Sequence, residues 1–273
     1  MTTLPTLIDS PSAGPVPADQ AGPVRRVLSL VERNFMIYRR SLTPVVFGLV
    51  EPVLYLLTIG YGVGSLVGSV PGVDTRYAAY VAPAILATTA MNTAVSHTIF
   101  GVFTRVKKDH TYEAIVPTPL SVTDIAYAEV TSAVINALIT SVGFLAALAA
   151  LGLVVSPGVL LAVPASVLVG VAFGAAGLAA TTYLRDFADL QLVQLVMLPM
   201  FLFATTFYPL TVYPRPLQPF IEVLPLYQSI ELIREPALGR FPATVPVAAG
   251  YLIVFSWLAL RIAIRRMGPM LAR

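Results

Sequence analysis

The chain has 273 residues, of which 57% are hydrophobic and only 11% are charged, and its mean hydropathy is +0.81. About a quarter of the residues of an ordinary soluble domain are charged, so this composition predicts a protein that crosses a membrane several times. The chain contains no cysteine. That absence excludes disulfide bonds, thiol catalysis and cysteine-based zinc or iron–sulfur sites.

Two regions precede the first long apolar segment. Residues 1–22 are rich in Pro, Ser, Ala and Thr and lack an apolar core, which predicts a disordered tail that is not a signal peptide. In residues 23–40, apolar side chains recur at helical spacing and most arginines fall between them. This pattern predicts an amphipathic helix in the headgroup layer of the membrane, and a helix packed on a soluble domain is the alternative.

Six apolar segments have about the length that a bilayer requires, which is roughly 20 helical residues. They cover residues 42–64, 77–103, 130–153, 159–183, 190–208 and 242–264. The fourth segment carries Gly170, Gly174 and Gly177, a stripe of small residues that favours close helix packing. We therefore expect an all-α polytopic membrane protein with six transmembrane helices.

The basic residues predict the orientation of these spans. Thirteen of the 17 lysines and arginines fall on one side of the six segments and four fall on the other. Basic residues gather on the cytoplasmic side of membrane proteins. Both termini and the loop of residues 105–129 are therefore predicted to be cytoplasmic.

Three polar side chains within the spans are candidates for function. Glu51 precedes Pro52 in the first span, and Asn92 and His97 share one face of the second. A carboxylate near the bilayer centre costs about 2.5–3.5 kcal/mol, so Glu51 is expected to face protein or water rather than lipid. Two interpretations stay open for these residues, a hydrogen bond between helices and a place on a translocation path.

The loop of residues 105–129 is far longer than a connection between two spans requires. It begins with three basic residues and continues with a helix-like piece over residues 111–116, which Pro117 and Pro119 end. This arrangement predicts that a partner outside the membrane binds the loop.

A second unusual segment covers residues 209–240. Its prolines separate two short apolar pieces, residues 217–224 and 226–238. Neither piece is long enough to span a bilayer, and both are too apolar for a solvated loop. We therefore predict that this segment, which precedes the last span, is a re-entrant helical hairpin. The hairpin is predicted to enter the membrane from the external side and to turn near Pro225.

Motifs for catalysis and nucleotide binding are missing from the sequence. It has no G-x-x-x-x-G-K-[ST] pattern and no Ser/His/Asp arrangement. We therefore expect a protein that is not an enzyme and has no nucleotide site of its own. A membrane body with one elaborate cytoplasmic loop suits a transporter that a separate motor drives.

Several short motifs, in order along residues 24–266, carry a family resemblance. They are Glu51-Pro52, Gly60-Tyr61-Gly62, Tyr112-Glu113-Ala114-Ile115, Pro117-Thr118-Pro119-Leu120, Glu129, Arg185-Asp186-Phe187, Phe207-Tyr208-Pro209-Leu210 and Leu224-Pro225-Leu226-Tyr227. With them the chain resembles the membrane subunits of ABC-2-type exporters. It is most similar to the branch of nodulation lipo-oligosaccharide and daunorubicin-resistance permeases. Many relatives carry an acidic residue near the position of His97.

The resemblance implies roles for particular residues. A coupling helix that docks on the ATPase would comprise Thr111, Tyr112, Glu113, Ala114, Ile115 and Val116, followed by Pro117. An outer gate would include Tyr208, Pro209, Glu222, Pro225 and Tyr227. Glu51, Asn92 and His97 would belong to the translocation path or to polar contacts between helices.

The resemblance also implies partners and a location. Two copies of an ABC ATPase would bind ATP and Mg, with no cofactor on this chain and no nucleic acid. A second permease, the same chain or a paralogue, would complete the exporter in the cytoplasmic (inner) membrane of a bacterium. The expected substrate is an amphipathic drug, lipid or glycolipid. A secondary, ion-coupled transporter and a non-transporting membrane scaffold are the alternatives.

Overall fold

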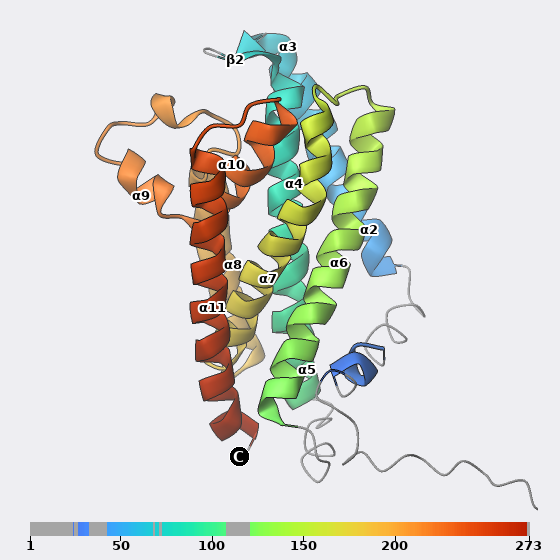
Figure 1. Ribbon diagram of the computed structural model, residues 1–273, viewed down its shortest axis with the longest axis vertical. Coiled ribbons are helices and arrows are strands. Elements are labelled where there is room, and N and C mark those ends of the chain that lie inside the picture. Colours follow the sequence, from blue (N-terminus) through green and yellow to red (C-terminus); the bar gives the residue numbers. More distant parts are fainter. Residues whose placement is uncertain are drawn as a thin grey trace, which may run out of the picture.

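The structure is a computed structural model, and it describes residue 24 and residues 27–32, 43–67, 69–70, 73–107 and 121–271. Its long helices run roughly side by side along the long axis (Figure 1). The first half contains α2 Thr43–Tyr55, the π-helix η2 Leu56–Val63, α3 Gly64–Val67, β1 Ser69–Val70, β2 Val73–Arg76, α4 Tyr77–Ser96, the π-helix η3 His97–Gly101, α5 Val102–Lys107 and α6 Val122–Ala150. The second half contains η4 Pro157–Leu161, α7 Ala162–Thr181, η5 Phe187–Asp189, α8 Leu190–Phe203, η6 Leu210–Val212, α9 Gln218–Glu222, α10 Pro225–Ala237 and α11 Thr244–Leu271.

Among the described residues, five helical stretches are long and apolar enough to cross a membrane. They are Gly48–Leu66, Tyr77–Arg105, Val122–Ala150, Pro157–Thr181 and Thr244–Gly268. The shorter apolar helix Phe187–Phe203 occupies the position of the predicted fifth span. The chain is thus an all-α polytopic membrane protein, with one small antiparallel hairpin, β1–β2, between η2 and α4.

Helix α4 is the centre of the bundle, and nearly every side chain from Tyr77 to Met91 is buried. It packs against α6, α7 and α10, while α11 packs on α7. The glycine stripe of α7 lies where these helices come closest. A Cβ added at Gly177 would lie 2.2 Å from the Oγ1 atom of Thr98 in η3. Only glycine fits there, as the small-residue stripe predicted.

Helix α6 begins inside the segment that the sequence analysis assigned to a loop. The Ser121 side chain accepts a hydrogen bond from the Asp124 backbone N–H at 3.1 Å, and the Asp124 carboxylate accepts one from the Ser121 N–H at 3.0 Å. This capping box fixes the helix start at Val122. Residues 122–129 are therefore helical, and Glu129 lies on α6 rather than in a loop.

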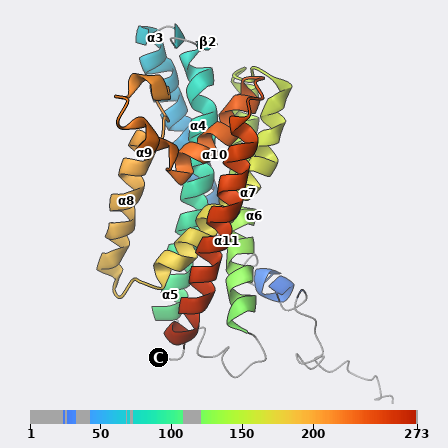
Figure 2. The ribbon, with the colours of Figure 1, turned by 60° about the vertical axis from the view of Figure 1, so that its left-hand side comes forward.

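Helix α8 ends at Phe203, five residues before the predicted end of the fifth span. Thr205 adopts a left-handed backbone conformation with φ of 60°, which stops the helix because residues other than glycine rarely adopt it. The chain then turns outward through η6 and α9 (Figure 2).

The segment before α11 forms two short helices, α9 and α10, and Pro225 is the first residue of α10. Phe220 on α9 and Val223 just after it are exposed apolar side chains, whereas α10 is mostly buried against α4 and α11. A Cβ at Gly158 would lie 2.0 Å from the carbonyl oxygen of Pro236, so the turn before α7 supports the end of α10. Insertion of the hairpin into a membrane stays a prediction.

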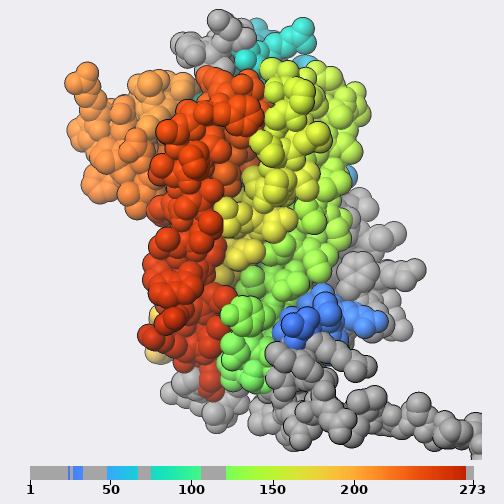
Figure 3. Space-filling model, viewed as in Figure 1, coloured from blue at the N-terminus to red at the C-terminus, as the bar shows by residue number. Residues whose placement is uncertain are grey.

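Residues 27–32 form a helical piece within the predicted amphipathic helix. Leu30 and Val31 are buried in a cluster with residues of α6, α7 and α11, while Leu28 is exposed. Figure 3 shows this piece, in blue, against the lower part of the molecule.

Candidate transport site

A cavity of about 540 Å³ lies between α2, α4, α6 and α8. Its size is within the range of small-molecule sites in proteins. Glu51, Asn92 and His97, the three polar span residues singled out in the sequence, all line it. They come from two different helices, so the fold brings together residues that are up to 46 positions apart.

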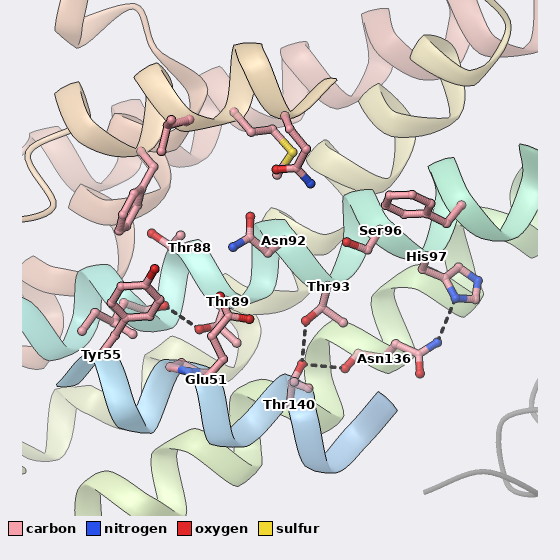
Figure 4. A pocket seen from close by; sticks show the side chains of 18 of the residues that line it. Glu51, Tyr55, Thr88, Thr89, Asn92, Thr93, Ser96, His97, Asn136 and Thr140 are labelled. Carbon is pink, nitrogen blue, oxygen red and sulfur yellow. Dashed lines mark hydrogen bonds between the residues drawn. The ribbon is translucent and has the colours of Figure 1, made fainter. Parts of the chain in front are cut away.

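Helix α4 and the first turns of η3 supply one continuous wall of the cavity. The lining residues on this wall are Ile85, Thr88, Thr89, Asn92, Thr93, Ser96, His97 and Phe100. They follow one another at intervals of one or three, which is the spacing of one face of a helix. Figure 4 shows these side chains along α4, with Thr89 close to Glu51 and Thr93 close to Thr140. The threonines were not among the residues predicted from the sequence, although they are spaced with Asn92 along one helical face.

The hydroxyl groups of this wall bond to their own helix. Thr88 donates to the carbonyl of Ala84 at 2.9 Å, and Thr89 donates to that of Ile85 at 2.8 Å. A hydroxyl oxygen that has donated its hydrogen keeps two lone pairs for accepting. Thr88 and Thr89 therefore offer hydrogen-bond acceptors to a guest while their own hydroxyl hydrogens are already bonded.

Helix α2 contributes the cavity's carboxylate. Glu51 is exposed to the cavity, and the next residue, Pro52, is buried within the helix. Gly48, one turn earlier, allows α2 to approach α6, since a Cβ there would lie 3.2 Å from the Cγ2 atom of Thr140. The small residue and the proline together set the position from which Glu51 faces α4.

Aromatic rings close one end of the cavity. The ring centroids of Phe201 and Phe207 are 5.3 Å apart in an edge-to-face arrangement, and those of Tyr55 and Phe201 are 6.4 Å apart. The Tyr77 hydroxyl donates to the carbonyl of Phe207 at 3.3 Å, which ties this cluster to the start of α4. A guest would therefore meet hydroxyls and amides along α4 and apolar rings at this end.

At its other end the cavity meets a chain of polar contacts. The Asn136 amide donates to the Ser132 carbonyl at 2.9 Å and lies 3.2 Å from Nδ1 of His97. Because an amide nitrogen only donates, Nδ1 of His97 accepts, and the ring hydrogen is on Nε2. Nε2 lies 3.8 Å from the carboxylate of Glu129.

Glu129 in turn binds the guanidinium of Arg105. The Glu129 side chain is 2% exposed and that of Arg105 is 14% exposed, so the carboxylate is buried and the guanidinium partly buried. Gly101 makes room for the pair, since a Cβ there would lie 3.1 Å from Arg105. The polar contacts thus run from the cavity to α5, the last described element before the long loop.

The predicted outer-gate residues do not line this cavity. Tyr208, Pro209 and Glu222 lie around α8, η6 and α9, and Pro225 and Tyr227 lie at the start of α10. The Glu222 carbonyl accepts a hydrogen bond from Gln228 at 2.6 Å, which joins α9 to α10. The predicted coupling residues, 111–117, lie outside the described residues.

Arg234 of α10 is a buried cation, and its burial was not predicted from the sequence. Arg234 of α10 is 2% exposed, and its guanidinium carbon lies 4.1 Å from the centre of the Tyr80 ring. It donates to the Tyr80 hydroxyl at 3.1 Å and to the carbonyls of Thr205 and Thr206 at 2.7 and 3.3 Å. Of the other arginines in this segment, Arg240 pairs with Glu235 at 2.9 Å.

No cluster of three or more His, Cys, Asp or Glu side chains among the described residues is arranged to hold a metal ion. The side chains that line the cavity offer a guest hydroxyls, amides, an imidazole, one carboxylate and aromatic rings.

Comparisons with known proteins agree with this picture of a helical membrane bundle. The family model described as ABC-2 type transporter matches residues 25–238. Nodulation protein J of Rhizobium leguminosarum bv. viciae is 32% identical over 230 residues, covering 84% of this chain and 88% of that protein. Nodulation protein J of Sinorhizobium fredii is 31% identical over 231 residues, covering 84% and 87%. Nodulation protein J of Rhizobium meliloti is 29% identical over 248 residues, covering 89% and 94%. The chain therefore belongs to the ABC-2 type transporter family and is a membrane subunit of that kind.

Proposed function

We propose that this permease exports an amphipathic compound, a drug, lipid or glycolipid, with energy from ATP hydrolysis on a separate subunit. The observation that carries the proposal is the cavity beside α4, which places Glu51, Asn92 and a row of hydroxyls inside an apolar bundle. Polar and ionisable groups are costly in a membrane and usually mark a substrate path. The family membership supports coupling to an ABC ATPase.

The helices beside the cavity support pairing with a second permease. Leu54 on α2 is 56% exposed, and Leu198 on α8 is 59% exposed. A second permease seated against α2 and α8 would enclose the cavity between two subunits. In the proposed orientation, both termini and the loop of residues 108–120 face the cytoplasm of a bacterium, and residues 111–117 dock on the ATPase.

The test is substrate-stimulated ATP hydrolysis by the complex that co-purifies with the permease, reconstituted into vesicles. Asn92→Phe fills the cavity with a larger apolar side chain and is expected to abolish stimulation. Ile253→Phe is the control, because Ile253 is 58% exposed on α11 and does not line the cavity. Equal stimulation of ATP hydrolysis in both variants would show that the cavity is not part of the transport path. Failure to co-purify any ATPase would overturn the proposed coupling.

Glu51 allows a finer test of the same site. Glu51→Gln keeps hydrogen bonding, whereas Glu51→Leu leaves a guest's donors unpaired, at a cost of about 1–3 kcal/mol. We expect transport to fall about tenfold or more in the leucine variant and less in the glutamine variant. Equal transport by the two variants would show that the carboxylate contacts no polar group that matters.

A further inference from the structure

A second cavity, of about 850 Å³, lies on another side of α8. Its walls come from α4, η3, α7, α8 and α11, and α9 with the start of α10 lies at one end. In Figure 2, α8 stands apart from α11, with α9 above it. None of the residues that line this cavity is charged, and most are aliphatic or aromatic. It is therefore suited to an apolar guest.

The two cavities adjoin each other at one side chain. Met197 of α8 lines both of them. On α4, Asn92 and Ser96 line the polar cavity, whereas Val95 lines the apolar one. The gap between α4 and α8 thus has a polar side and an apolar side, with Met197 between them.

Met197 differs from most of α8. It is 9% exposed, whereas its neighbours Val196 and Leu198 are 68% and 59% exposed. A methionine side chain is unbranched and has three rotatable bonds, so it adapts readily to the shape of its surroundings. A rotamer change at Met197 can therefore join the two cavities without moving the backbone of α8.

We propose that one amphiphile occupies both cavities at once, with its head beside α4 in the polar cavity and its apolar chain in the second cavity, past Met197. This inference rests on the proposed function and specifies its substrate class. The head would be rich in hydroxyl or amide groups, because Asn92, Gln194 and the threonines recognise hydrogen-bonding groups rather than anions, and Glu51 disfavours a negative charge. The apolar chain of the amphiphile would stay in apolar surroundings while its head is inside the bundle.

The shared side chain carries the specificity of this arrangement. A guest without an apolar chain would leave the second cavity to solvent or lipid, and a guest with a bulky rigid apolar part would collide with Met197. The junction therefore selects for a single flexible chain attached to a polar head.

The experiment uses the complex with its ATPase in phosphatidylcholine nanodiscs, without ATP, and two photoreactive probes. Both are dodecyl maltosides, one with a diazirine at the end of the chain and one with a diazirine on the sugar. Tagged positions are mapped by mass spectrometry, with and without excess unlabelled dodecyl maltoside below its solubilising concentration. Only tags that the excess removes report a specific site.

The proposal expects removable chain-end tags at Val196 and removable sugar tags on α2 and α4. Leu195 is the matched position, because it is also 68% exposed but lines neither cavity, and its tags should not be removable. Met197→Trp is expected to lower removable chain-end tagging about tenfold, since overpacking costs about 1–3 kcal/mol. Met197→Leu conserves volume and should retain it.

Three results would overturn the proposal. The first is removable tagging that is unchanged in Met197→Trp. The second is equal tagging of Val196 by a diazirine phosphatidylcholine that excess maltoside does not displace, which would assign the cavity to bilayer lipid. The third is a disulfide between two copies of Val196→Cys, which would assign the cavity to an interface between permeases. None of these results affects co-purification of an ATPase, so a failure here is distinguishable from a failure of the proposed function.

Discussion

Helices α5 and α10 lie near opposite ends of the bundle (Figure 1), and each carries an arginine that is held in a different way. Arg105 of α5 binds the carboxylate of Glu129, so one formal charge faces another. Arg234 of α10 lies over the Tyr80 ring and donates to the backbone carbonyls of Thr205 and Thr206. The first arrangement joins side chains next to the polar cavity, and the second fixes the backbone where α8 ends.

The physical difference concerns what balances the charge. A buried ion pair is costly to desolvate, and removing one partner leaves the other charge uncompensated. Around Arg234, the groups in direct contact are dipoles, and the carboxylate of Glu231, three residues earlier on α10, attracts the guanidinium without a direct ion pair. A backbone carbonyl oxygen carries partial negative charge and is a strong hydrogen-bond acceptor for a cation, and an aromatic face adds a cation–π attraction. We expect the two ends to respond differently when one group is removed.

The largest effect is expected from Glu129→Ala. It leaves Arg105 partly buried without its carboxylate, which should destabilise the protein by about 3–5 kcal/mol. The melting temperature of the purified permease in detergent measures the loss. Glu222→Ala removes an exposed carboxylate on α9 and is the control. A melting temperature as high as that of the control would mean that the pair contributes nothing to folding.

A smaller effect is expected from Arg234→Met, because the groups that hydrogen-bond to Arg234 are neutral. We expect the free energy of unfolding to fall by about 2–3 kcal/mol, because the carbonyls of Thr205 and Thr206 would be buried without a donor. The loss should also be local. In a Thr206→Cys background, where residue 206 is otherwise 0% exposed, Arg234→Met should speed the reaction with a small maleimide. An unchanged rate would separate Arg234 from the end of α8.

The charge alone is expected to be insufficient at this position. Arg234→Lys keeps the cation but lacks the planar guanidinium that reaches two carbonyls while stacking on Tyr80. A loss of about 1–2 kcal/mol is expected, between the wild type and the methionine variant. Full stability with lysine would show that charge, and not geometry, holds the helix end.

The smallest effect is expected from Asn136→Leu, which removes the donor to Nδ1 of His97. It should cost about 1 kcal/mol. The ¹⁵N chemical shifts of the imidazole give a more direct reading, taken in a His110→Gln background so that His97 is the one histidine left. The wild type should show the Nε2–H tautomer and the variant a mixture. The same tautomer in both would assign the preference to Glu129 instead.

The sequence predicted the parts of this structure that depend on local pattern. Long apolar segments predicted the helices, and the spacing of Gly170, Gly174 and Gly177 predicted close packing of this helix, although not that its neighbours there are α6 and η3. Glu51, Asn92 and His97 stood out because polar groups are rare in spans. That they share one cavity depends on how α2 packs against α4, which no local pattern encodes.

Glu129 and Arg234 show why other parts of the structure were harder to predict. Glu129 was assigned to a loop because the polar residues before it hid the start of α6, although Ser121 and Asp124 already had the spacing of a capping box. Arg234 lies among prolines and glutamates, which is the composition of an exposed segment. Its burial follows from contacts with residues 28 and 154 positions away. Tertiary contacts of that kind produce no periodic pattern in the sequence.

The contacts of Arg234 also bear on how the protein is made. Translation proceeds from the N-terminus, so Tyr80, Thr205 and Thr206 have all been synthesised before Arg234 is. An arginine without partners costs about 2.5–3.5 kcal/mol at the centre of a membrane-inserted helix. In the natural order of synthesis its acceptors already exist when α10 emerges. We expect a circular permutant that begins at α10 to insert with lower yield, because its arginine would have to await every one of its partners.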